Sequence, residues 1–405
     1  MIKIIDVILN QMAKVCKPQK KFMTNLMGGI LATRGKLNFR NISRHGSFTE
    51  KTISRNYRKE FDFAEFNGLL IKQQLASESR KTAAFDPTFI AKSGKHTHGI
   101  ASFWNGSAGH AEKGLEASLL SVIDVDSKSA YAISASQTPN LKKNPQKNCD
   151  SGDEETRIDA YLGHIIRDHK HLPAEVKHIT VDAFFSKKKF VHGILQGTNL
   201  HVVGKLRIDA NLRFPFAGQQ SGKGRPKKFD GKFSLDDLSK LSHEGPTNDG
   251  KIQLYSGVLN SVSLEMSIKN VVAITEHKKR TCKAILFSTD LNLSALEIYQ
   301  FYSSRFQIEF QFRDAKHFTG LDNCQARLES SLNFHFNASF MALNLSRFMY
   351  HSGDPGDPFS MSTIKSRCYN ERLIESLFPM FDIDPTLIKD TPAYQKALNY
   401  GAIHV

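Results

Sequence analysis

The sequence predicts an α/β fold with a mixed sheet, preceded by a helical segment and interrupted by a second, β-rich segment. Strand-like and helix-like patterns alternate between residues 82 and 205, which favours a sheet covered by helices. Strand-like runs without intervening helical patterns follow each other from 251 to 288. The first 80 residues contain few β-rich runs and are expected to be helical.

The order of the core elements is a series of strands, a helix, a strand, a helix and a strand. The helical patterns span about 157–168 and 187–196. The strand-like runs lie near 82–86, 98–104, 116–124, 129–135, 176–182 and 200–206. This is the order of a ribonuclease H-like core, in which acidic residues at the ends of adjacent strands come together.

Composition limits the class of protein. Forty per cent hydrophobic and 23% charged residues are typical of a globular chain of 405 residues with two or three domains. The net charge of +15 points to a polyanion, with nucleic acid as the first candidate and a membrane surface as the alternative. No apolar run reaches about 18 residues, so we expect no transmembrane helix. Five cysteines without a C-x-x-C pair favour reduced thiols and disfavour a zinc site.

The first fifth of the chain carries much of the positive charge. Residues 1–80 contain 15 Lys/Arg and 6 Asp/Glu. The stretch 41–59 resembles a helix, a glycine-containing turn and a second helix, which would present Lys51, Arg55 and Arg58 to DNA. A basic, solvated helical bundle is the alternative interpretation.

The segment 301–320 contains the densest set of candidate site residues. Tyr302, Arg305, Glu309 and Lys316 follow the spacing Y-(2)-R-(3)-E-(6)-K. On one continuous helix these four side chains would share a face. A carboxylate between cations can bind a metal ion while the cations bind phosphate oxygens. The alternative is a solvated helix face with favourable charge spacing.

Two aspartates upstream follow strand-like runs. Asp86 ends the run 82–86, with Pro87 expected to terminate the strand, and Asp182 follows the β-branched run 179–181. An aspartate after a strand is most often a turn former or helix cap. Only the combination of both aspartates with Glu309 indicates a shared site.

These motifs resemble the bacterial insertion-sequence DDE transposases of the insertion-sequence-four superfamily. The resemblance covers roughly residues 80 to 350, with Phe306 where the family often has Trp and Ala183 where it often has Gly. It implies that Asp86, Asp182 and Glu309 are catalytic ligands of Mg²⁺, with Mn²⁺ as a substitute. It also implies that Tyr302, Arg305 and Lys316 bind the DNA backbone.

The same resemblance implies cleavage at transposon ends and transfer of the 3′-OH strand into target DNA. The expected partners are double-stranded DNA, comprising terminal inverted repeats and target DNA, and a second copy of the chain in a synaptic homodimer. No membrane partner is expected, and the location would be the bacterial cytoplasm at the nucleoid. Two alternatives stay open: a catalytically inactive DNA-binding protein derived from a transposase, and a ribonuclease H-like nuclease without joining activity.

The sequence also predicts where the domains divide. We expect a basic helical DNA-binding domain, a first core part, a β-rich insertion, a second core part with the YREK helix and a C-terminal segment. These correspond to residues 1–78, 79–206, 207–288, 289–351 and 352–405.

Overall fold

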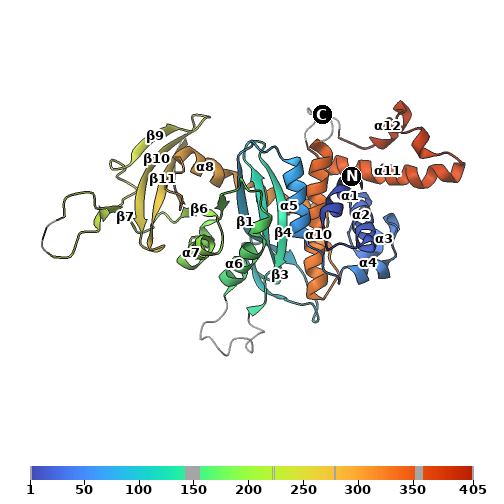
Figure 1. Cartoon of the computed structure of the whole chain (residues 1–405), viewed down its shortest axis with the longest axis horizontal. Helices are drawn as coiled ribbons and strands as arrows, with labels where there is room; N and C mark the ends of the chain where they lie inside the picture. The colour runs from blue at the N-terminus through green and yellow to red at the C-terminus, as the bar shows by residue number, and fades with distance from the viewer. Residues whose placement is uncertain are drawn as a thin grey trace.

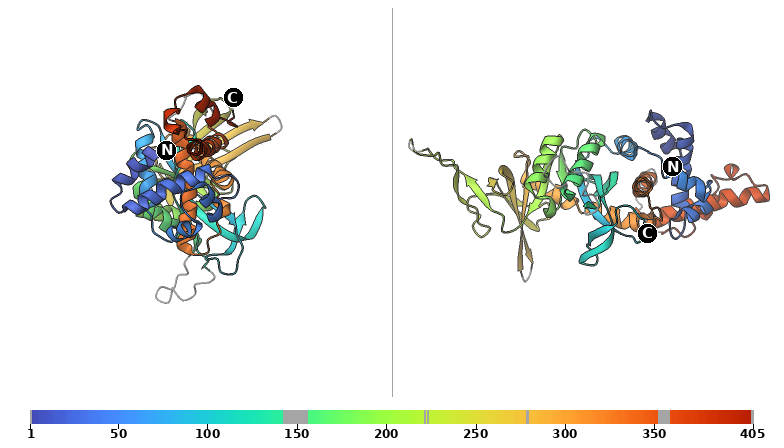
Figure 2. Two further views of the ribbon diagram at one scale, coloured as in Figure 1. Left: turned by 90° about the vertical axis from the view of Figure 1, so that its right-hand side faces the viewer. Right: turned by 90° about the horizontal axis from the view of Figure 1, so that it is seen from below.

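The computed structural model describes residues 2–141, 156–220, 222, 224–277, 280–351 and 359–403. Figure 1 shows an elongated molecule with a β-rich end, a central sheet flanked by helices, and a helical end that contains the first and last helices. The right-hand view of Figure 2 shows the same three parts from below. The observed class is therefore α/β with a large mixed sheet.

The central part of the sheet has the strand order β4-β3-β1-β5-β6. Strands β1, β3 and β4 are antiparallel, whereas β5 and β6 run parallel to β1. This arrangement is compatible with a ribonuclease H-like fold. The bounds of these strands are Lys81–Ala91 (β1), Ala101–Asn105 (β2), His110–Asp124 (β3), Ser129–Gln137 (β4), His178–Thr180 (β5) and His201–Leu206 (β6).

Helices cover this sheet on both faces because neighbouring residues of β1 point to opposite sides. Phe85 packs edge-on against Tyr161 of α6, while on the adjoining strand the Ser121 hydroxyl donates to Gln311 of α9 at 2.7 Å. The helices that flank the core are α6 (Arg157–Asp168), α7 (Lys188–Gly197), α8 (Ala295–Ser304), α9 (Gln307–Phe318) and α10 (Glu329–His351). Short 3₁₀ turns occur at His169–His171, Ala183–Phe185 and Leu321–Asn323.

The open edge of β4 is closed by asparagine side chains instead of another strand. Asn344 of α10 accepts from the Ala132 amide at 2.9 Å and donates to the Ala132 carbonyl at 2.8 Å. Asn337 makes the same pair of bonds with Ala135, at 2.8 and 2.7 Å. The asparagines thereby satisfy backbone groups that an edge strand otherwise leaves unpaired.

The β-rich segment continues the central sheet, because β12 pairs antiparallel with β6 and with β11. The order then runs through β10 and β7 to β8, and β9 pairs with β10. Its strands are Leu212–Pro215 (β7), Phe229–Lys232 (β8), Ser242–Pro246 (β9), Ile252–Ser261 (β10), Met266–His277 (β11) and Arg280–Ser288 (β12). In Figure 1 these strands form the end of the molecule farthest from α11.

The helical end is built from both ends of the chain. Tyr57 packs against Phe334 of α10, with ring centroids 4.5 Å apart, and the N-terminal helices share one hydrophobic core with the sheet. The helices are α1 (Ile2–Gln11), α2 (Lys17–Ala32), α3 (Phe39–His45), α4 (Glu50–Asn56), α5 (Phe63–Gln74), α11 (Met361–Leu377) and α12 (Pro392–Leu398). Two 3₁₀ turns, Phe378–Phe381 and Pro385–Leu387, separate α11 from α12. None of the helices in the described ranges combines the length and apolar character of a membrane-spanning segment.

Candidate active site

Asp86 lies in the middle of β1, and the expectation that Pro87 ends this strand is wrong. The strand continues to Ala91, paired with β3 along its whole length. On the other side of β1 the parallel partner β5 pairs only with Ala83 and Ala84. Beyond Ala84, no strand among the described residues pairs with that side of β1, so a proline, which lacks an amide donor, is tolerated there.

The environment of Asp86 raises the pKa of its carboxyl group. Burial raises the pKa of Asp86 to about 7, against the lowering effect of the Arg305 guanidinium. The nearby carboxylates of Asp182 and Glu309 also raise the pKa of Asp86. A carboxyl among other carboxylates in a buried position is a feature of functional sites.

Asp182 lies where the sequence predicted it, just after β5. The Val181 amide still donates to Val203 of β6 at 3.0 Å, and Asp182 then begins the 3₁₀ turn Ala183–Phe185. Because β5 is parallel to β1, this strand end lies beside the strand that carries Asp86.

Glu309 lies on α9, and the expectation that the whole YREK motif lies on one continuous helix is wrong. Helix α8 ends at Ser304 and α9 begins at Gln307. Across the junction, Ile308 and Glu309 donate their amides to Arg305 and Phe306, three residues earlier, which tightens the turn. The even angular spacing of a single helix therefore does not apply across the YREK motif. Phe306 is also 49% exposed, so the aromatic residues do not bury the motif completely.

Arg305, at the junction, joins two of the three carboxylates. Its Nη1 lies 3.2 Å from Oδ2 of Asp86 and its Nη2 lies 3.4 Å from Oε1 of Glu309. Only 13% of the Arg305 side chain is exposed, and within the described residues its buried Nε has no hydrogen-bond partner. The guanidinium thus supplies the positive charge between the carboxylates in this structure.

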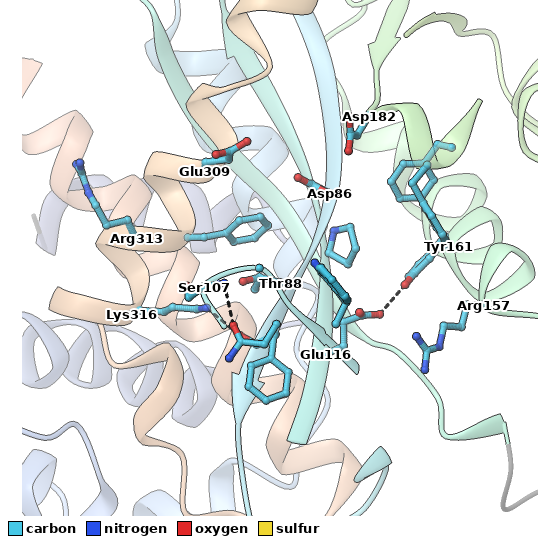
Figure 3. A pocket seen from close by; sticks show the side chains of 18 of the residues that line it. Asp86, Thr88, Ser107, Glu116, Arg157, Tyr161, Asp182, Glu309, Arg313 and Lys316 are labelled. Atoms are coloured by element: carbon cyan, nitrogen blue, oxygen red, sulfur yellow. Dashed lines mark hydrogen bonds between the residues drawn. The ribbon is translucent and has the colours of Figure 1, made fainter. Parts of the chain in front are cut away.

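Asp86, Asp182 and Glu309 line one cavity of about 950 Å³. Figure 3 shows the three carboxylates around the upper part of the cavity, from β1, the end of β5 and α9. The sequence prediction that these residues meet is therefore consistent with the structure. A chain separation of more than 200 residues is bridged because α9 packs across the sheet beside β1.

The other members of the motif lie close to these carboxylates. Lys316 lines the same cavity, but its Nζ donates to the Phe89 carbonyl at 2.8 Å. The Arg305 guanidinium lies 5.9 Å from the ring centre of Tyr302. Both cations are therefore engaged within the protein and must change partners to bind a phosphate.

The carboxylates fit a hard divalent cation by their chemistry, because Mg²⁺ and Mn²⁺ prefer oxygen ligands. Burial and, to a smaller extent, the neighbouring carboxylates raise the pKa of Asp86, and a cation bound beside it would lower that pKa again. In the described part of the chain, however, no group of three or more His, Cys, Asp or Glu side chains is close enough to hold a metal ion. Arg305 lies between the candidate ligands instead.

Several residues of the cavity were missed by the sequence analysis. Glu116 of β3 is 5% exposed and accepts a 2.5 Å hydrogen bond from the Tyr161 hydroxyl. Burial raises the pKa of Glu116. The sequence feature that could have pointed to Glu116 is its position as a charged residue near the start of the apolar run 115–123. The cavity also includes Trp104, Arg157, Phe184 and Arg313.

The basic helix of the N-terminal segment forms as predicted, with α3 and α4 separated by a short turn. Lys51, Arg55 and Arg58 are exposed and line a second cavity of about 700 Å³ together with Phe39. Figure 1 shows α4 on the far side of α10 from the sheet. The structure thus does not bring these three cations to the carboxylates.

Comparison with protein families identifies the chain. Residues 20–252 match the model of the DDE superfamily endonucleases. The chain belongs to the DDE superfamily endonucleases. The matched range includes Asp86 and Asp182 and ends before Glu309. A comparison with curated proteins gave no match.

Membership of the DDE endonucleases implies a nuclease of the transposase type that acts on DNA. DDE nucleases generally use divalent metal ions. Both properties agree with the net charge of +15 and with a cavity lined by carboxylates.

Proposed function

We propose that this DDE endonuclease is a transposase of the insertion-sequence-four superfamily, which cleaves transposon ends and joins the 3′-OH strand to target DNA. The observation that supports it most is the shared cavity of Asp86, Asp182 and Glu309. The YREK spacing adds support because Arg305 and Lys316 lie next to that cavity or in it.

Asp86, Asp182 and Glu309 would hold Mg²⁺ or Mn²⁺. A divalent ion bound there supplies charge stabilisation for phosphodiester chemistry. The protein's own contribution is to place three carboxylates around one cavity.

Tyr302, Arg305 and Lys316 would bind the DNA backbone beside the scissile phosphate. Arg305 would leave Asp86 and Glu309 when a divalent ion takes up these carboxylates. Lys316 would exchange the neutral Phe89 carbonyl for a charged phosphate oxygen. Their present partners keep both side chains close to the position where the phosphate is expected.

The helices α3 and α4 would bind DNA outside the catalytic cavity. Lys51 and Arg55 are exposed on α4, and Arg58 is exposed two residues after the helix ends. In this proposal residues 1–78 recognise the DNA, 79–206 and 289–351 form the catalytic core, and 207–288 are an insertion that supports it.

The reaction would proceed in two steps in the same cavity. A water oxygen bonds to phosphorus, the bond from phosphorus to the 3′ oxygen breaks, and the transposon end leaves with a free 3′-OH. That hydroxyl oxygen then attacks a target phosphate and displaces a target 3′ oxygen. Two ends must react together, so a homodimer would form the synaptic complex.

Cleavage of DNA that carries the gene's own flanking sequences tests the proposal. The chain is incubated with Mg²⁺ or Mn²⁺, the nicks are mapped, and strand transfer into a plasmid is scored. Asp182→Asn and Glu309→Gln are the site variants. Asp236→Asn is the matched control, because the Asp236 side chain is 95% exposed in the β-rich segment.

The expected result is metal-dependent nicks at both flanks with 3′-OH ends, lost in the site variants and kept in Asp236→Asn. Nicks without strand transfer would assign the chain to nucleases that do not join DNA. DNA binding without nicks in either metal would overturn the enzyme proposal in favour of an inactive DNA-binding protein.

A further inference from the structure

Trp104 is the only tryptophan in the chain and lies at the mouth of the carboxylate cavity. Its side chain is 61% exposed. Within the described residues its indole has no hydrogen bond and no aromatic or cationic partner. A large aromatic ring that is exposed and unpartnered beside a functional cavity is available for a ligand.

The backbone beneath Trp104 is held firmly. Phe103, the preceding residue on β2, is buried on the opposite face, and the Arg157 guanidinium lies 4.6 Å from its ring centre. Arg157 also donates to the Ser102 carbonyl at 2.8 Å, which ties β2 to α6. Alternation along the strand then directs Trp104 away from the packed face.

The turn that follows Trp104 leaves space beside the indole. Asn105, Gly106 and Ser107 also line the cavity, and a Cβ added at Gly106 would meet nothing within 4 Å. Figure 3 shows the side chain of Ser107 on the same side of the cavity as Lys316. The hairpin of β2 and β3 therefore holds the backbone of Trp104 in place. The indole lies next to the opening of a cavity whose lining includes Lys316.

We propose that Trp104 stacks on an unpaired nucleobase of the DNA strand that enters the cavity. This rests on the proposed DNA-cleaving function and adds a positioning residue to it. Stacking suits a site that must accept many sequences, since every base presents a flat face. An unpaired base fits better than a paired one because the ring faces of a duplex are already stacked.

The single tryptophan makes the test specific, because emission excited at wavelengths that tyrosine does not absorb reports Trp104 alone. The full chain is titrated in EDTA, which prevents cleavage, with an oligodeoxythymidine strand of about 20 nucleotides and with a blunt duplex of the same length. A fluorescent label on the DNA gives binding independently by anisotropy. Trp104→Phe and Trp104→Ala are compared with Phe381→Ala, which removes a distant aromatic side chain that is 71% exposed.

We expect emission to fall in parallel with single-strand binding, and to fall less with the duplex. Trp104→Ala is expected to bind the single strand about tenfold more weakly, with Trp104→Phe retaining most of the affinity. Phe381→Ala should match the parent. Because Trp104 is exposed, the thermal unfolding temperature of all three variants should stay unchanged.

Saturated single-strand binding with unchanged Trp104 emission would overturn this proposal, as would equal affinity of Trp104→Ala and the parent. If the parent also cleaves flanking DNA, the transposase proposal survives that result. If the parent binds neither DNA, both proposals fail together.

Discussion

Buried polar groups occur on two sides of β1, and the two sets are paired very differently. On the Phe85 side, His164 of α6 lies between Ser118 and Ser134, at 2.8 Å from its Nδ1 and 2.9 Å from its Nε2. On the Asp86 side, the carboxylates share one guanidinium whose Nε has no partner among the described residues.

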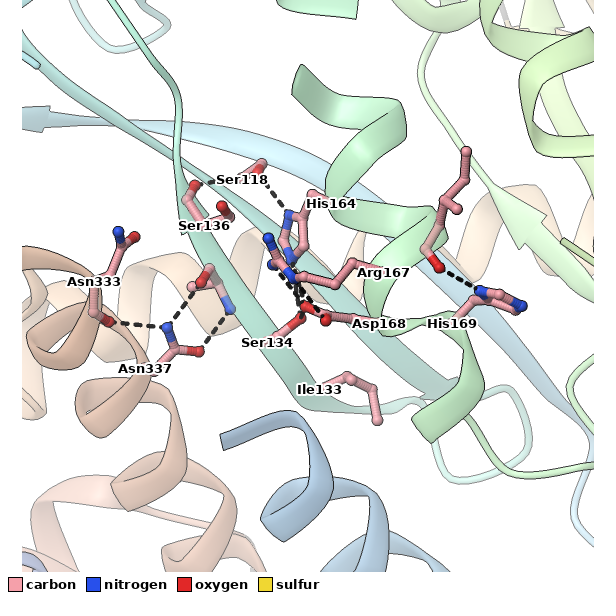
Figure 4. Close-up of polar contacts among 12 residues, drawn as sticks. Ser118, Ile133, Ser134, Ser136, His164, Arg167, Asp168, His169, Asn333 and Asn337 are labelled. Carbon is pink, nitrogen blue, oxygen red and sulfur yellow. Dashed lines mark hydrogen bonds and ion pairs between the residues drawn. The ribbon is translucent and has the colours of Figure 1, made fainter. Parts of the chain in front are cut away.

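Both ring nitrogens of His164 have a hydrogen-bond partner. The Ser134 hydroxyl donates to Asp168 at 2.6 Å, so it accepts from Nε2 of His164. Nδ1 lies 2.8 Å from the Ser118 hydroxyl, whose one proton is shared between Nδ1 and the Ser136 carbonyl at 3.2 Å. Arg167 donates twice to Asp168, at 2.8 Å each (Figure 4). Such a network stabilises one arrangement. The carboxylate cavity instead keeps charges whose partners can be exchanged, which suits a site that binds DNA.

The largest expected effect is the loss of DNA cleavage when a carboxylate on the Asp86 side of β1 is removed. Glu309→Gln should reduce cleavage by about a thousandfold, because it removes one of the three carboxylates proposed to hold the divalent ion. Its unfolding temperature should not fall, since the variant also removes repulsion among the carboxylates. Single-turnover cleavage and thermal unfolding of the same preparation measure both. A stable Glu309→Gln enzyme with parental cleavage would remove Glu309 from the site.

On the Phe85 side of β1, His164 should make the free energy of unfolding depend on pH. Burial lowers the pKa of His164 to about 4, below its ordinary value near 6.5. Between these two values the unfolded chain binds a proton that the folded chain excludes. Stability is therefore present above the ordinary pKa and lost as the pH falls through this window, by about 3 kcal/mol in total.

His164→Gln isolates this contribution, because glutamine does not titrate. The variant should be less stable than the parent at pH 7, and the difference in unfolding free energy should narrow as the pH falls from 6.5 to 4. Urea unfolding at several pH values measures the difference. A constant difference across this range would show that His164 is not the group that titrates.

The asparagine edge of β4 gives a smaller expected effect. Asn344→Leu leaves the Ala132 amide and carbonyl without their partners and should destabilise the fold by about 1–3 kcal/mol. Asn399→Leu is a control, since Asn399 lies outside the core just after α12. Urea unfolding compares the two. Equal stability of Asn344→Leu and the parent would mean that water replaces the lost bonds.

Much of the candidate site was predictable because local patterns report strands and their ends. Asp182 follows a β-branched run, and its position after β5 agrees with the prediction. Pairing beyond the local run was not predictable: Pro87 could not be placed inside a strand without knowing that β5 is short. The break between α8 and α9 was also missed, because neither Gly nor Pro marks it.

Glu116 and the exchange of partners at Arg305 depend on tertiary contacts that no local pattern contains. The sequence placed Arg305 beside Glu309 through their spacing. It did not show that the guanidinium also reaches Asp86, more than 200 residues away, at 3.2 Å. That contact is the reason for the last prediction.

Arg305→Met should strengthen the binding of Mn²⁺ to the DNA-free protein by about tenfold, the change that 1.4 kcal/mol produces. In the parent, Arg305 neutralises Asp86 and Glu309, so a divalent ion must compete with a guanidinium that is nearly buried. Free Mn²⁺ measured by electron paramagnetic resonance reports this affinity without any cleavage. The same variant should bind DNA more weakly, because the guanidinium no longer reaches a phosphate.

Arg313→Met is the matched control, since it removes the same charge from the cavity wall. The Arg313 side chain is 58% exposed and pairs with Asp314, so its field at the carboxylates is screened by water. Its Mn²⁺ affinity should change little. Equal Mn²⁺ affinities of Arg305→Met, Arg313→Met and the parent would show that Arg305 does not compete with the ion. The two sides of β1 would then differ in how their polar groups are arranged, and not in whether their partners can be exchanged.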